Sequence, residues 1–111
     1  MVKVLISDSM SPRAEEIFLN RGIEVQVKTG MLEEELIDTI AGFDGLAVRS
    51  ATKVTNRVLS AAKNLKVVGR AGIGVDNVDL ESATANGVVV MNTPFGNAIT
   101  TAEHAIAMIM A

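Results

Sequence analysis

The chain lacks cysteine, tryptophan and tyrosine, and it has only three phenylalanines among its 111 residues. Without cysteine it forms neither a disulfide nor a thiolate metal site, which fits a reducing compartment such as the cytoplasm. The scarcity of aromatic rings argues against a surface that stacks nucleic-acid bases, and equally against a flavin site. A net charge of −3 also disfavours a polyanion, so we expect no nucleic-acid partner.

The chain also lacks a hydrophobic run long enough to cross a membrane. The apolar run at the amino terminus soon meets Asp8, so it is too short for a signal peptide or a membrane span. The apolar run at 105–111 is shorter than a bilayer requires. The sequence therefore predicts a soluble, cytoplasmic protein without a membrane partner.

What the sequence does contain is a regular alternation of short apolar strands and amphipathic helices, in a length that suits one domain. Helices are expected after the first four strands, with Ser11, Thr55 and Asp79 as amino-terminal caps. The expected strands are 2–7, 23–27, 45–48, 66–70 and 88–91. This alternation predicts an α/β fold: a flavodoxin-like, doubly wound parallel sheet of five strands in the order 2-1-3-4-5.

A final helix is expected over 98–111, with a capping box formed by Thr100 and Glu103. Its second half contains no polar residue, and a free domain seldom ends in a helix that is apolar on every side. We expect this helix to lead into a further domain and to make the isolated chain self-associate. The chain thus divides into a domain over 1–97 and the start of an interdomain helix.

The stretch 67–79 runs from a buried strand into a bend with glycines at positions 69, 72 and 74, and it contains Arg70. In such sheets ligands bind beyond the carboxyl ends of the strands, where Arg49 and Arg70 would converge on one crevice. An arginine fork suits a carboxylate or a phosphate. The sequence therefore predicts a pocket for a small anion, with a plain turn and a surface arginine as the alternative.

Motifs for other chemistry are missing. The pair Gly72 and Gly74 has no third glycine and follows the fourth strand, so it is not a dinucleotide fingerprint. A phosphoacceptor receiver domain shares the expected strand order, but it would need acids and a lysine where Asp8, Arg49 and Asn92 stand. These mismatches make a receiver domain the weaker interpretation.

The remaining titratable candidates have simple structural interpretations. The acidic run 33–35 is interpreted as a solvated helix face, so no metal is expected. His104 follows Glu103 in the last expected helix and has no nucleophile nearby in sequence, which suggests a helix-surface or domain-contact residue.

Three segments of the sequence resemble the NAD-dependent D-2-hydroxyacid dehydrogenases. They are 48–52, 68–79 and 91–97, followed by Ala-Glu-His at 102–104, and they occur in the order and spacing of that family. The resemblance extends over the whole chain. The pair Arg49 and Arg70, with the string Gly-Arg-Ala-Gly, is similar to the branch of the family that oxidises 3-phospho-D-glycerate.

The resemblance implies an oxidoreductase with two domains, a flavodoxin-like substrate domain and a Rossmann domain that binds NAD. The implied reaction is oxidation of 3-phospho-D-glycerate to 3-phosphohydroxypyruvate, the first step of serine biosynthesis, by a homo-oligomer. Two alternatives stay open. One is another member of the family, such as a glycerate or hydroxypyruvate reductase, and the other is a stand-alone ligand-binding or regulatory module.

The resemblance also implies which residues form the site. The positions that match substrate contacts are Arg49, Ser50, Arg70, Ala71, Gly72 and Asn97. Among these, Arg70 matches a contact on the phosphate side, and Ala71 and Gly72 match main-chain groups near the substrate carboxylate. Ile73 matches a position that touches the nicotinamide end of NAD.

The family's catalytic arginine, glutamate and histidine match no residue of this chain, and neither does its glycine-rich pyrophosphate loop. His104 does not correspond to the catalytic histidine. Because hydride transfer needs cofactor and substrate held together, the chain by itself is expected to be inactive and to bind NAD weakly at best.

Overall fold

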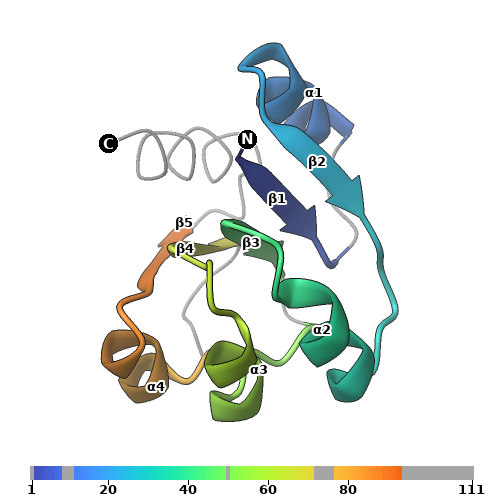
Figure 1. Cartoon of the computed structure of the whole chain (residues 1–111). Coiled ribbons are helices and arrows are strands. Elements are labelled where there is room, and N and C mark those ends of the chain that lie inside the picture. The colour runs from blue at the N-terminus through green and yellow to red at the C-terminus, as the bar shows by residue number, and fades with distance from the viewer. Residues whose placement is uncertain (1, 9–11, 50, 72–76, 94–111) are drawn as a thin grey trace.

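Within the described part of the chain, five parallel strands form a central sheet and four helices pack against it (Figure 1). The computed structural model describes residues 2–8, 12–49, 51–71 and 77–93. The strands are β1 (Lys3–Ile6), β2 (Glu24–Val27), β3 (Gly45–Val48), β4 (Val67–Ala71) and β5 (Val89–Thr93). The helices are α1 (Pro12–Asn20), α2 (Glu33–Ile40), α3 (Asn56–Ala61) and α4 (Leu80–Ala85).

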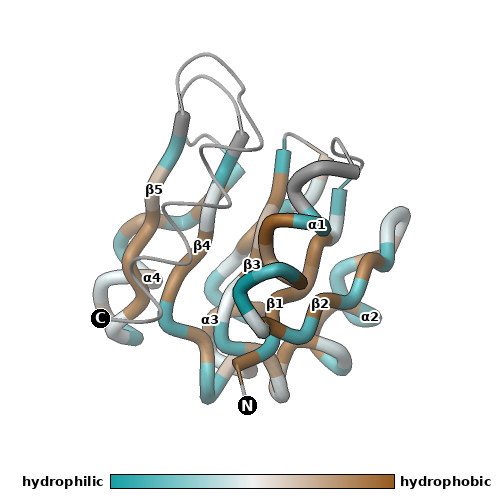
Figure 2. Tube along the Cα trace, turned by 90° about the horizontal axis from the view of Figure 1, so that it is seen from above, coloured by the Kyte–Doolittle hydropathy of each residue, from teal (hydrophilic) through white to brown (hydrophobic). Residues whose placement is uncertain are grey.

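The strand order is β2-β1-β3-β4-β5, and every pairing is parallel, which confirms the predicted topology. The central strands are hydrophobic along much of their length, as Figure 2 shows. All four residues of β3 are buried, whereas only Val25 of the edge strand β2 is even partly buried. Central strands covered on both faces need continuous apolar sequence, while an edge strand tolerates alternation.

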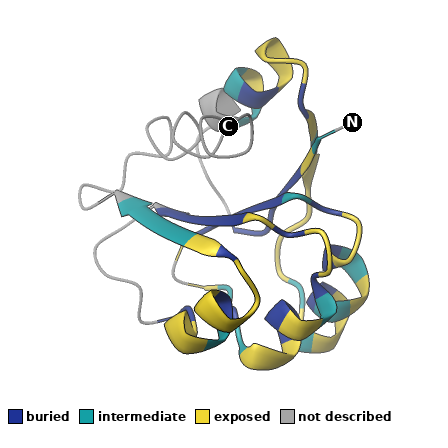
Figure 3. Ribbon diagram, turned by 60° about the vertical axis from the view of Figure 1, so that its left-hand side comes forward, coloured by how far each residue is buried: buried dark blue, intermediate teal, exposed yellow. Residues whose placement is uncertain are grey.

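The helices cover both faces of the sheet. Helices α2, α3 and α4 lie on one face and α1 on the other, and their outward sides are exposed (Figures 1 and 3). The larger core lies beneath α2–α4 and includes Leu36 of α2, Leu59 of α3 and Ala83 of α4. The smaller core packs Phe18 of α1 against Val4 and Ile6 of β1. Both cores exclude water and hold the strands in register.

Two helix starts predicted from the sequence are confirmed. The Thr55 hydroxyl accepts a hydrogen bond from the Val58 N–H at 3.4 Å, and the Asp79 carboxylate accepts one from the Ser82 N–H at 3.1 Å. Each satisfies a backbone donor that the first helical turn leaves without an intrahelical acceptor. The cap expected at Ser11 lies outside the described residues.

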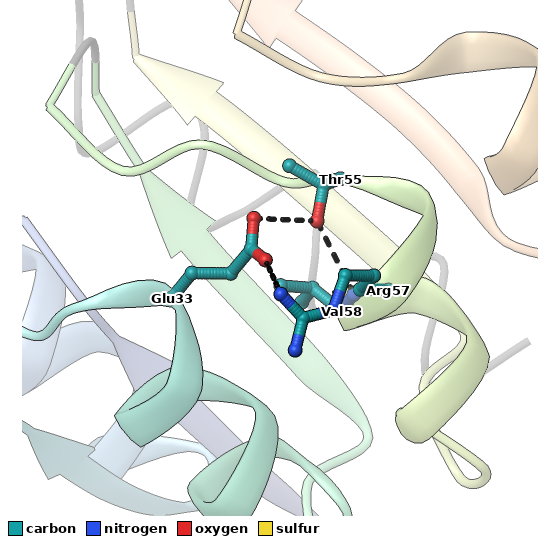
Figure 4. A network of polar contacts seen from close by, with 4 residues as sticks. All are labelled: Glu33, Thr55, Arg57 and Val58. Carbon is teal, nitrogen blue, oxygen red and sulfur yellow. Dashed lines mark hydrogen bonds and ion pairs between the residues drawn. The ribbon is translucent and has the colours of Figure 1, made fainter.

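Helices α2 and α3 are joined by a polar network around Glu33 (Figure 4). Its carboxylate accepts hydrogen bonds from the Arg57 guanidinium at 2.8 Å and from the Thr55 hydroxyl at 3.1 Å. The acidic side chain therefore links the two helices instead of facing solvent alone.

Strand ends differ slightly from the sequence prediction. The first strand is shorter than expected, and β5 continues to Thr93 because Asn92 and Thr93 pair with Arg70 and Ala71 of β4. In the part of the chain that the structure describes, no helix is long and apolar enough to cross a membrane. The expected helix over 98–111, with Thr100 and Glu103, lies outside the described residues.

Candidate functional site

Polar residues follow the apolar strands at the carboxyl edge of the sheet, where hydropathy changes along the tube in Figure 2. Asp8 lies beyond the end of β1, Arg49 directly follows β3, and Arg70 and Asn92 lie near the ends of β4 and β5. The register pairs Val48 with Arg70 and Arg70 with Asn92, so these strand ends are level. The edge at which parallel α/β sheets bind ligands is thus polar in four neighbouring strands.

The two arginines of this edge have different surroundings. Arg49 is exposed, whereas Arg70 retains only 9% of its accessible surface. Because side chains alternate along a strand, Arg70 lies on the same face of β4 as Val68, the face that carries α2–α4. The pair therefore supplies one exposed and one buried arginine to the same edge.

Not every residue of the expected site is among the described ones. The structure brings Arg49, Arg70 and the backbone of Ala71 to one edge, where Ala71 pairs with Thr93. The other expected positions, Ser50, Gly72, Ile73 and Asn97, lie outside the described residues.

The segment after β3 is held by Asp8, whose side chain is 5% exposed. One carboxylate oxygen, Oδ2, accepts hydrogen bonds from the Arg49 N–H at 2.7 Å and the Thr52 N–H at 3.0 Å. The other, Oδ1, accepts one from the Thr52 hydroxyl at 2.6 Å. Several donors around a buried carboxylate offset the cost of removing its charge from water.

Asn77 holds the same segment from the opposite side. Its Nδ2 group donates to the carbonyl of Arg49 at 2.7 Å and to the carbonyl of Thr52 at 2.6 Å. The Val54 N–H donates to the Asn77 carbonyl at 2.7 Å, within an isolated parallel bridge between Val54 and Val78. The connection from β4 to α4 and the segment after β3 are thus joined through side chain and backbone.

This frame of Asp8, Thr52 and Asn77 is absent from the site expected from the sequence. The sequence does not indicate which residues bond to Asp8, and Thr52 and Asn77 stand there only inside the segments that resemble the family. One local signal was present. An aspartate directly after a buried strand, where solvent-exposed loops usually begin, indicates a carboxylate that accepts backbone N–H groups.

The chemistry available at the described edge is binding. Two guanidinium groups offer planar donors for a carboxylate or phosphate. In the described ranges, no group of three or more histidine, cysteine, aspartate or glutamate side chains is placed to hold a metal ion. His104 lies outside those ranges.

Comparison with known proteins gives close relatives over nearly the whole chain. D-3-phosphoglycerate dehydrogenase from Archaeoglobus fulgidus is 52% identical over 110 residues, which are 99% of this chain and 21% of the relative. The human protein of the same name is 55% identical over 108 residues, covering 97% of this chain and 20% of its own length. The chain therefore spans about one fifth of these curated relatives.

Solved structures show the same fold. The NAD⁺-bound 3-phosphoglycerate dehydrogenase of Entamoeba histolytica is 31% identical, with a TM-score of 0.77 over 84% of this chain and 33% of that one. A protein from Pyrococcus horikoshii is 36% identical, with a TM-score of 0.79 over 84% of this chain and 28% of its own.

The sequence profile of the D-isomer specific 2-hydroxyacid dehydrogenase catalytic domain matches residues 4–107. This match includes Asp8, Arg49, Arg70 and Asn77. The chain belongs to the D-isomer specific 2-hydroxyacid dehydrogenase family.

Proposed function

We propose that the chain is the substrate-binding part of an NAD-dependent dehydrogenase that oxidises 3-phospho-D-glycerate to 3-phosphohydroxypyruvate, the first step of serine biosynthesis. The observation that carries the proposal is the pair of arginines, Arg49 and Arg70, at the ligand-binding edge of two neighbouring strands. The names of the relatives support the substrate assignment.

The substrate has a carboxylate at one end and a phosphate at the other, so its pocket needs positive charge in two places. Arg70 would contact the phosphate side, and Arg49 with Ser50 would contact the rest of the substrate. Main-chain N–H groups of Ala71 and Gly72 would face the carboxylate, and Asn97 would line the cleft. Charge-assisted hydrogen bonds of this kind are stronger than neutral ones and fix orientation as well as affinity.

NAD, when bound, accepts the hydride that leaves the substrate carbon. Ile73 would touch its nicotinamide end. The rest of the cofactor does not fit the described residues, because β1 is followed by Ser7 and the buried carboxylate of Asp8 instead of a glycine-rich turn. The chain's own role is to bind and orient the acid, and it contributes no catalytic residue.

The proposal includes the organisation of the longer enzyme. Residues 1–97 would form the substrate domain, and 98–111 would begin a helix that leads to the NAD-binding domain. The intact enzyme would be a cytoplasmic homo-oligomer, and the isolated chain would self-associate through the apolar part of that helix. Sedimentation over a wide concentration range tests the last point, since a clean monomer throughout would contradict it.

The function is tested by assaying the intact dehydrogenase for NADH formation with 3-phospho-D-glycerate. Turnover with this acid, together with none by the 111-residue chain alone, is the expected result. Turnover with glycerate, or reduction of hydroxypyruvate, without activity on the phosphorylated acid would assign another reaction of the family. Activity of the isolated chain would refute its role as a binding part only.

A further inference from the structure

The short segment that carries Arg49 is held at its backbone from both sides. The N–H of Arg49 donates to Asp8, and its carbonyl accepts from Asn77. The same is true of Thr52, whose N–H donates to Asp8 and whose carbonyl accepts from Asn77. Four backbone groups of one segment are therefore fixed by two side chains that come from other parts of the fold.

Both holding side chains are buried, and the Asp8 carboxylate and the Asn77 Nδ2 group direct their hydrogen bonds to this segment. Asp8 is 5% exposed and Asn77 is 8% exposed. The Nδ2 group of Asn77 has two hydrogens, and the two carbonyls accept both. The Ser7 and Thr52 hydroxyls lie 3.0 Å apart, and because Thr52 donates to Asp8, Ser7 is the donor of that pair.

The held segment begins with an arginine, Arg49, that is itself exposed. A long side chain on a mobile backbone loses much conformational freedom when it binds a ligand, and a fixed backbone removes part of that loss beforehand. Small displacements of a binding group are costly for catalysis, because reacting atoms must be placed to within about an ångström. A buried frame beneath an exposed cation is an arrangement suited to preorganisation.

We infer that Asp8 and Asn77 are positioning residues, which set the location of the Arg49 guanidinium in the substrate pocket by fixing its backbone. The inference rests on the proposed function, because it assigns Arg49 a substrate contact. Thr52 belongs to the same frame through its hydroxyl. None of the three needs to touch the substrate, and their effect on the reaction passes through Arg49.

The test compares steady-state kinetics of intact dehydrogenase variants with those of the wild type. Asp8→Asn, which replaces one acceptor oxygen by a donor, should raise the KM for the hydroxy acid about tenfold and leave the KM for NAD unchanged. Thr52→Val should act in the same direction, and Thr52→Ser should restore wild-type values because it keeps the hydroxyl.

The matched control is Asp44→Asn. The Asp44 carboxylate also accepts a backbone N–H, that of Lys3 at 2.9 Å, but at the amino end of the strands, away from the ligand-binding edge. This variant should keep the wild-type KM for the hydroxy acid. Thermal unfolding of every variant is measured in parallel, so that loss of folding is separated from loss of binding.

A double-mutant cycle distinguishes positioning from a general structural effect. If Asp8 acts through Arg49, Asp8→Asn should change the KM less than twofold once Arg49→Ala is present, since coupled residues are not additive. An equal effect in both backgrounds overturns the inference, and so does an unchanged KM in a folded Asp8→Asn variant.

A failure of the proposed function gives a different result from a failure of this inference. If the wild type oxidises another hydroxy acid, the same cycle is run with that acid. Titration with the acid that the wild type oxidises, without NAD and followed through the Arg49 Nε–H signal by NMR, needs no turnover. Weaker binding of that acid in Asp8→Asn than in Asp44→Asn supports the frame, and equal binding in the two variants refutes it.

Discussion

At the scale of single residues, the site contrasts an exposed with a buried arginine. Arg49 faces solvent beyond β3, and Arg70 is almost wholly enclosed within β4. Their presence at one edge was predictable, because both lie at the carboxyl ends of recognisable strands. The difference in burial was not predictable, because it depends on how the surrounding elements pack around each strand end. The partners of Asp8 were equally hidden, since Thr52 lies 44 residues away in sequence.

Replacing Arg70 by alanine should weaken binding of the phosphorylated acid to the intact enzyme by roughly 2–4 kcal/mol, because a charge-assisted pair would be lost. Isothermal titration with 3-phospho-D-glycerate measures this effect. Arg57→Ala is the control, since Arg57 is an exposed arginine that belongs to helix α3 instead of a strand end and pairs with Glu33. Equal affinities of the two variants for the phosphorylated acid would show that Arg70 does not contact it.

Asp79, the cap of α4, gives a prediction about pH. The backbone N–H and then the hydroxyl of Ser82 donate to its carboxylate and hold the pKa of Asp79 below its ordinary value. The ionised form therefore stabilises the fold above the pKa of the unfolded chain, about 4, and this contribution disappears as the pH falls through the lower folded pKa.

Asp79→Asn keeps a side chain suited to capping but removes the titration. Urea unfolding at a series of pH values should therefore show the wild type losing stability relative to this variant below about pH 4. A stability difference that stays constant across the whole acid range would show that the charge of Asp79 plays no part.

At the scale of secondary-structure elements, short sequence signals were sufficient to predict where most helices begin and end. Caps at Thr55 and Asp79 and left-handed glycines at 22 and 87 mark helix ends through the nearest few residues, so a sequence reveals them. Strand length is set by pairing instead. Strand β5 reaches Thr93 only because β4 continues beside it.

Helix α1 packs on the sheet through Phe18, with Ile17 partly buried beside it. Phe18 is fully buried against residues of β1, β3 and β4. Phe18→Ala should lower the free energy of unfolding by roughly 3–5 kcal/mol, through lost burial and a remaining cavity. Leu19→Ala, at the neighbouring position that is 53% exposed, should cost much less, below about 1 kcal/mol. Chemical denaturation measures both, and similar losses would contradict the described packing.

At the scale of the whole molecule, strand order and layers follow from the alternation of strands and helices with short connections. The frame around Arg49 does not follow from that pattern. It joins the end of β1, the segment after β3 and the connection between β4 and α4. Its members are ordinary polar residues that acquire a role only when the strands bring them together.

The bridge between Val54 and Val78 affects how the two connections that it joins unfold locally. The Asp79 N–H donates to the Val54 carbonyl at 2.9 Å, and the Val54 N–H donates back to the Asn77 carbonyl. These amide hydrogens lie in connections between elements, where exchange with solvent deuterium is ordinarily fast. Here neither can exchange unless both connections separate. We expect the Val54 and Asp79 amides to exchange at one common, slow rate in hydrogen-exchange NMR, which would make the two connections a single cooperative unit of unfolding.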